Sequence, residues 1–180
     1  KMKFSDQDQL FIFIAGHGEY DRIFKEGYLV CKDSRGDDIA KQSYVNHSTL
    51  RTYVGNINCK HIFLVMDVCF GGTFDPLLAS RGGAASEKNV TKDQFILRKM
   101  KHKTRQYLTS GGKEYVPDGR PGHHSPFARK FIEALRSGGG KDGVLTISEL
   151  MVFVDHVTPE PRHGEFSDNE PGSEFLFIKK

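Results

Sequence analysis

Apolar and polar positions along this chain alternate between two patterns, one typical of strands and one typical of helices. Residues 10–15 and 62–68 are almost continuously apolar, and each run is soon followed by glycine. Short continuous runs of this kind are typical of strands buried on both faces of a parallel sheet. We therefore expect buried strands there, with a weaker strand over residues 27–31, a short strand over 106–109 and a last strand over 173–178.

Three further segments carry helical signals. Residues 48–57 place apolar side chains at spacings of four and three. A Ser-Pro pair supplies the N-cap and the first-turn proline of a helix over residues 125–135. Within residues 146–157, a Thr followed three positions later by a Glu forms a capping box. Strands that alternate with helices predict an α/β fold, with a mostly parallel central sheet flanked by helices.

The segment between the second apolar run and residue 104 shows neither pattern. It is rich in glycine, small residues and basic residues, which is typical of a long loop. We expect residues 1–180 to form a single domain. Its ordered core is predicted to span residues 1–70 and 104–180, and residues 73–103 are predicted to form a mobile loop.

Composition narrows the class of protein. With 180 residues, of which 37% are hydrophobic and 27% are charged, the chain can bury a core. No apolar run approaches the roughly 18 residues needed to span a bilayer. The net charge of +3 does not indicate nucleic acid or an anionic membrane as a partner. The cysteines, Cys31, Cys59 and Cys69, are odd in number and far apart, which predicts reduced thiols and a cytoplasmic protein.

A reactive side chain follows each of the two apolar runs. His17 lies between two glycines directly after the first run, and Cys69 follows the second. The carboxyl ends of neighbouring strands in an open α/β sheet converge on one crevice, so His17 and Cys69 can meet there. A free thiol is mostly protonated at neutral pH, and a nearby imidazole makes it a nucleophile. The amides of Gly18 and Cys69 are candidates for stabilising an oxyanion.

Taken in order, four blocks resemble the caspase-like cysteine peptidases, which include caspases, metacaspases, paracaspases and their bacterial relatives. The blocks are Gly-His-Gly-Glu at residues 16–19, Asp-x-Cys-x-Gly-Gly at 67–72, Tyr-Leu-Thr-Ser-Gly-Gly at 107–112 and Ser-Pro-Phe at 125–127. The resemblance implies a caspase-like fold and a cysteine endopeptidase that hydrolyses protein substrates, with His17 and Cys69 as the catalytic dyad. Family domains place a strand and a helix before the histidine strand, so we expect the first strand to be lacking here. A preceding segment or a regulatory partner could supply it.

Substrate specificity is predicted from Asp67, which stands where caspases have glutamine, two positions before the cysteine. Residues i and i+2 of a strand face the same side, so the Asp67 carboxylate is expected in the crevice with Cys69. A buried carboxylate needs a partner, and an arginine or lysine of the substrate would supply one. Metacaspases and paracaspases, which the chain resembles at this position, cleave after basic residues. Glu114 falls where a paracaspase-like second pocket acid would lie, and we predict cleavage after Arg, with Lys second.

The implied chemistry requires no cofactor, and the spacing of the residues predicts no metal site. Some metacaspases depend on calcium, and Glu19, Asp21 or Asp75 could contribute to such activation, although nothing in their spacing establishes it. An acidic pocket also makes the basic loop after the cysteine a candidate for self-processing. Arg81, beside two glycines, is the first candidate position.

Three alternatives remain open. The chain could be a caspase-like peptidase that cleaves after Asp or after a hydrophobic residue, with Asp67 in a structural role. It could be a catalytically silent scaffold that binds a partner through this fold. A redox switch at Cys69 is the third alternative, but Cys69 lacks the second cysteine of a CxxC pair.

Overall fold

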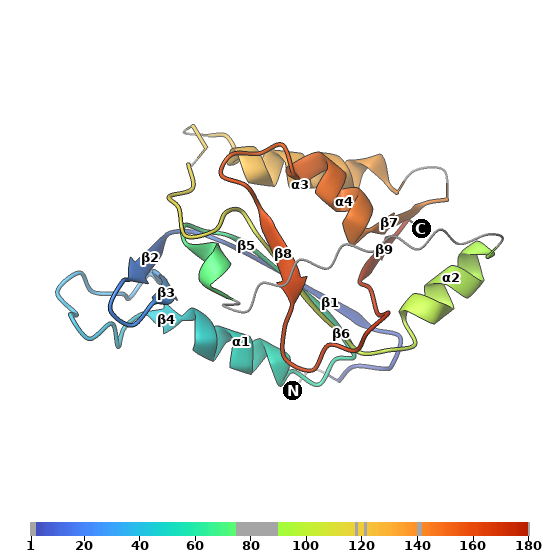
Figure 1. Ribbon diagram of the computed structural model, residues 1–180, viewed down its shortest axis with the longest axis horizontal. Coiled ribbons are helices and arrows are strands. Elements are labelled where there is room, and N and C mark those ends of the chain that lie inside the picture. Colours follow the sequence, from blue (N-terminus) through green and yellow to red (C-terminus); the bar gives the residue numbers. More distant parts are fainter. Residues whose placement is uncertain (1–2, 75–89, 118, 121, 140–141, 180) are drawn as a thin grey trace.

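A central sheet of four strands organises the fold (Figure 1). Its order is β1 (Gln9–Ala15), β5 (His61–Asp67), β6 (Thr104–Thr109) and β8 (Arg162–Glu165). The first three strands are parallel, and β8 runs antiparallel to β6. The predicted α/β class with a mostly parallel sheet is confirmed. The computed structural model describes residues 3–74, 90–117, 119–120, 122–139 and 142–179.

Helices cover both faces of this sheet (Figure 1). α3 (Pro126–Ser137) and α4 (Ile147–Val154) lie on one face, and α1 (His47–Gly55) lies on the other. Alternate side chains of β5 enter two separate cores, because Phe63 packs with α3 and α4 whereas Ile62 packs with α1. This two-sided burial explains why β5 is apolar at nearly every position. Within the described ranges, no helix has the length and apolar character needed to cross a membrane.

Two smaller sheets flank the central one. β2 (Gly18–Asp21), β3 (Glu26–Leu29) and β4 (Val45–Asn46) form an antiparallel sheet that follows the carboxyl end of β1. At the opposite end of the chain, β7 (Val144–Thr146) pairs with β9 (Leu176–Ile178). The strand predicted at the end of the chain therefore exists, but it pairs with β7 outside the central sheet.

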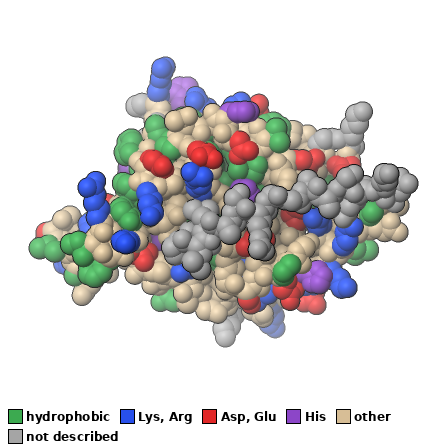
Figure 2. All heavy atoms as spheres, in the orientation of Figure 1, with side chains coloured by type: hydrophobic (Ala, Val, Ile, Leu, Met, Phe, Trp, Pro, Cys, Tyr) green, Lys and Arg blue, Asp and Glu red, His purple; other side chains and the backbone are tan. Residues whose placement is uncertain are grey.

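The turn between β2 and β3 presents two large apolar side chains to solvent. Ile23 is 86% exposed and Phe24 is 76% exposed. The Asp21 carboxylate accepts hydrogen bonds from the amides of both residues, at 2.7 and 3.0 Å, and so holds the turn. Figure 2 shows hydrophobic and basic side chains near each other at this end of the molecule. Asp21 therefore has a local structural role in this fold.

Two short elements overlap the interval that the sequence predicts as a loop. η1 (Gly71–Phe74) is a single 3₁₀ turn after the cysteine, and α2 (Lys92–Lys99) is a helix. The Thr91 hydroxyl accepts from the Gln94 amide while the Gln94 side chain accepts from the Thr91 amide, which is a capping box. Within the predicted mobile loop over residues 73–103, the structure therefore has a helix at Lys92–Lys99, and η1 ends just inside its start. The capping signal is present in the sequence, but it follows a stretch whose composition resembles a linker.

Strand β1 forms one edge of the central sheet. In the described part of the chain, β5 is its only neighbour in the sheet. Phe11 and Phe13 are 36% and 39% exposed, although both rings contact Phe131 of α3. The prediction that this strand is buried on both faces is therefore only partly correct, because an edge strand has no neighbour to shield one side.

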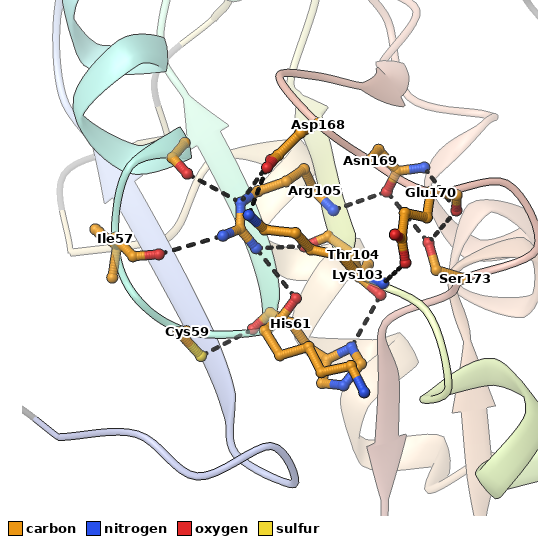
Figure 3. A network of polar contacts seen from close by, with 12 residues as sticks. Ile57, Cys59, His61, Lys103, Thr104, Arg105, Asp168, Asn169, Glu170 and Ser173 are labelled. Atoms are coloured by element: carbon orange, nitrogen blue, oxygen red, sulfur yellow. Dashed lines mark hydrogen bonds and ion pairs between the residues drawn. The ribbon is translucent and has the colours of Figure 1, made fainter.

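A buried arginine joins the end of α1 to the starts of β5 and β6 (Figure 3). The side chain of Arg105 is 1% exposed and donates hydrogen bonds to main-chain carbonyls at 2.8 to 3.3 Å. Burial lowers the pKa of Arg105 from its ordinary value, and the nearby Asp168 carboxylate opposes that change. The guanidinium stabilises this corner of the fold because it gives the Gly55 carbonyl, at the end of α1, a donor and ties three further carbonyls from neighbouring segments to it. The carbonyls belong to Gly55, Ile57, Lys60 and Thr104.

Candidate active site

A cleft of about 250 Å³ opens at the carboxyl ends of β1 and β5. Parallel pairing places Ala15 beside Asp67, and the Gly16 amide donates to the Asp67 carbonyl at 3.2 Å. The two strand ends that carry the candidate catalytic residues therefore lie next to each other. Among the described residues, the polar part of the lining comes from Asp67, Cys69, His124 and Ser125. The rest comes from Phe13, Ala15, Gly16, Val68, Val116, Pro117, Gly119 and Ala128.

Cys69 lies in the wall of this cleft, and the residue as a whole is only 6% exposed. Its sulfur is 3.4 Å from the Val116 amide nitrogen and 3.5 Å from the Val116 carbonyl oxygen. The next residue, Phe70, has a φ of 62°, a left-handed conformation that is rare for a bulky residue. Its ring stacks on Tyr20, with 5.9 Å between ring centroids. Strained residues of this kind gather at functional sites, where the surrounding contacts hold them in place.

His17 lies in the short connection between β1 and β2, and its side chain is exposed. Its carbonyl accepts a hydrogen bond from the Val30 amide at 2.9 Å, which anchors the connection to the small sheet. The following residue, Gly18, packs directly against the backbone of Cys69, since a Cβ built on Gly18 would lie 2.1 Å from the Cys69 carbonyl oxygen. The structure thus brings the histidine segment and the cysteine segment together. Gly16 is among the described residues that line the cleft, and His17 is not.

The close approach at Gly18 leads to a testable prediction. Gly18→Ala is expected to lower the free energy of unfolding by about 2 kcal/mol, because the new methyl group must displace the Cys69 backbone. Gly16→Ala is the matched control, since a Cβ at Gly16 would meet no described atom within 4 Å. Urea unfolding of both variants measures the difference. Equal stability of the two variants would show that the Gly18 contact is not tight.

Asp67 and Cys69 both line the cleft, but β5 ends at Asp67, so Cys69 lies in the turn after the strand and not on the strand itself, as the two-residue period assumed. The Asp67 Oδ2 accepts a hydrogen bond from the Ser125 hydroxyl at 2.5 Å. Glu114 is placed differently, because its side chain is exposed and folds back over Gly112. The Glu114 carbonyl instead accepts from the Phe70 amide at 3.3 Å. The structure therefore brings Asp67 and Cys69 to one cleft, and it does not place the Glu114 carboxylate there.

The geometry thus offers a thiol and a carboxylate in one cleft wall and a histidine in the adjoining turn. A comparison of the chain with protein-family models, curated proteins and solved structures finds no match. A thiol beside a glycine-rich, histidine-bearing turn is suited to acyl transfer, in which the sulfur attacks a carbonyl carbon.

His47 supports the turn after the cysteine and was not foreseen from the sequence. Its Nδ1 lies 2.8 Å from the Thr73 hydroxyl, which itself donates to the Phe70 carbonyl at 2.9 Å. Because a hydroxyl has one proton, Nδ1 must be the donor in its contact with Thr73. Burial lowers the pKa of His47 to about 4, although the Glu26 charge opposes this change, so the ring is neutral at pH 7. Residues 47 and 73 come together only in the folded structure, and no sequence pattern indicates their contact.

The acidic residues considered for calcium have other contacts. The Glu19 carboxylate pairs with the Lys41 ammonium, and the Asp21 carboxylate holds its own turn. Asp75 lies outside the described residues. No group of three or more potential metal ligands occurs among the residues that are described. The geometry of Glu19 and Asp21 therefore gives no support to a calcium site built on them.

Proposed function

We propose that this chain is a caspase-like cysteine endopeptidase that hydrolyses peptide bonds in protein substrates, preferably after Arg and secondarily after Lys. The main support is the cleft that Asp67 and Cys69 share, with Gly18 packed against the cysteine backbone. The α/β architecture agrees with this proposal, because the cleft lies at the carboxyl ends of parallel strands. The three cysteines are free thiols, which favours a reducing cytoplasmic setting.

In the proposed reaction, His17 removes the proton of the Cys69 thiol, and the sulfur attacks the carbonyl carbon of the scissile bond. The amides of Gly18 and Cys69 donate to the oxygen that becomes negative. His17 then gives its proton to the leaving amine, and a thioester forms between Cys69 and the amino-terminal part of the substrate. A water molecule hydrolyses the thioester, which returns the thiol and releases a carboxylic acid.

Asp67 is proposed to hold the basic side chain before the scissile bond. The Asp67 carboxylate lines the same cleft as the nucleophile. A substrate arginine whose guanidinium binds there would therefore have its main-chain carbonyl near Cys69. Glu114 remains a predicted second acid, and it would have to swing away from Gly112 to reach the pocket. The predicted self-processing position, Arg81, lies outside the described residues.

Covalent labelling tests the proposed function. A peptide electrophile with arginine at the position before the reactive group is expected to modify the wild-type protein at one cysteine. Cys69→Ala should abolish this labelling. Cys31→Ala is the matched control and should be labelled normally, because Cys31 is a half-buried thiol after β3 that is not part of the described cleft lining.

Intact mass and peptide mapping identify the labelled residue, and fluorogenic peptides with Arg, Lys, Asp or Leu before the bond report turnover. Cleavage after Asp or Leu, with none after Arg or Lys, would favour the alternative specificity. A folded protein that neither reacts with the electrophile nor cleaves any of these peptides would contradict the peptidase proposal and favour a silent scaffold.

A further inference from the structure

Ser125 contacts two functionally distinct parts of the molecule at once. Its hydroxyl oxygen accepts a hydrogen bond from the Ala128 amide at 2.9 Å, which caps the first turn of α3. The same hydroxyl lies 2.5 Å from the Asp67 Oδ2 atom. A carboxylate oxygen can only accept, so the single hydroxyl proton must point at Asp67. Ser125 is therefore an acceptor toward the helix and a donor toward the cleft.

The helix that carries Ser125 is firmly held. In α3, Phe127 and Ala134 are fully buried, Phe131 is 2% exposed, and all three belong to the core on that face of the sheet. Pro126 at the first helical position also fixes the backbone direction next to Ser125. The Ser125 oxygen is consequently fixed in space before any substrate binds. The positive end of the α3 dipole also lies on the side of the Asp67 carboxylate.

We propose that Ser125 is a positioning residue that orients the Asp67 carboxylate for bidentate binding of a substrate guanidinium; this inference rests on the proposed function. A guanidinium is planar, and its paired N–H groups bind a carboxylate only in a limited range of orientations. An ammonium is a point charge with donors that rotate freely, so it tolerates a carboxylate that turns. Ser125 thereby favours arginine over lysine at this position of the substrate.

The test compares Ser125→Ala with wild-type protein on matched arginyl and lysyl peptides. Ser125→Ala is expected to lower kcat/KM for the arginyl peptide about tenfold, mainly through KM, and to lower the Arg-to-Lys preference roughly fivefold. Ser125→Thr keeps a hydroxyl and should restore most of the preference.

Loss of the helix cap must be separated from loss of the carboxylate contact. Thr146→Ala is the matched control, because Thr146 caps α4 through the Glu149 amide and is not among the described residues of the cleft. Both alanine variants should lower Tm by a similar amount, whereas only Ser125→Ala should change the Arg-to-Lys ratio.

The possible outcomes are distinct. An unchanged ratio in Ser125→Ala, or an equal change in both alanine variants, overturns the role of Ser125 while the peptidase proposal stands. A wild-type protein that cleaves neither peptide overturns the proposed specificity and, with it, this inference.

Discussion

Replacement of Asp67 with Asn is expected to lower kcat/KM for an arginyl peptide on the order of a hundredfold. Asparagine has the same shape and keeps an oxygen that can accept from the Ser125 hydroxyl. The substitution therefore removes the negative charge while leaving the packing of the cleft nearly intact. Removing one member of a desolvated charge pair typically weakens binding by about 2 to 5 kcal/mol. A hundredfold loss of kcat/KM lies in the lower part of this range.

The substrate provides the control for this prediction. A peptide with leucine before the bond should be cleaved by Asp67→Asn as well as by the wild-type protein, because it offers no cation to the carboxylate. Glu114→Gln measures whether the exposed Glu114 side chain contributes after substrate binds. Steady-state kinetics on the arginyl and leucyl peptides give both values. An equal loss on both peptides would assign Asp67 a structural role and refute its assignment to the pocket.

Arg105→Met is expected to lower the free energy of unfolding by at least about 3 kcal/mol. Methionine fills much of the same volume but donates no hydrogen bonds, so four main-chain carbonyls lose the guanidinium that they share. Replacing a buried ion pair with apolar side chains is often harmless, but these acceptors belong to the backbone and cannot be removed with the arginine. Urea unfolding monitored by circular dichroism measures the change.

Lys103→Met is the matched control for this prediction. Lys103 contacts the same Asp168 carboxylate at 2.5 Å, yet its side chain is 34% exposed and that of Asp168 is 58% exposed. Exposed ion pairs contribute between about 0 and 1 kcal/mol, so this variant should unfold almost like the wild type. If Arg105→Met were no less stable than Lys103→Met, the carbonyl network in Figure 3 would not be a main source of stability.

The elements that sequence patterns predicted well are those whose signals are local. β5 could be recognised because strands buried on both faces are apolar throughout. α3 and α4 could be recognised because Ser125 and Thr146 carry capping signals that act within four residues. β8 was missed because its four residues, Arg-His-Gly-Glu, become a strand only through pairing with β6.

In the candidate site, too, contacts between residues close in sequence are easier to predict than contacts between distant residues. Asp67 and Cys69 line one cleft, but β5 ends at Asp67, so the turn that follows the strand, and not the two-residue period of the strand, places Cys69 there. The contact between Ser125 and Asp67 joins positions 58 residues apart and depends on how α3 packs. The exposed side-chain position of Glu114 likewise depends on the loop after β6, whose conformation no pattern in the sequence specifies.

The edge position of β1 has a consequence for handling the protein. Among the described strands β1 pairs only with β5, so the main-chain donors and acceptors on its other side, beside the partly exposed Phe11 and Phe13, can template the addition of another extended polypeptide. Self-association through this edge would deplete monomers as the protein is concentrated. Turnover per molecule should therefore be compared across a dilution series, because strand addition next to His17 could alter the cleft without any change in sequence.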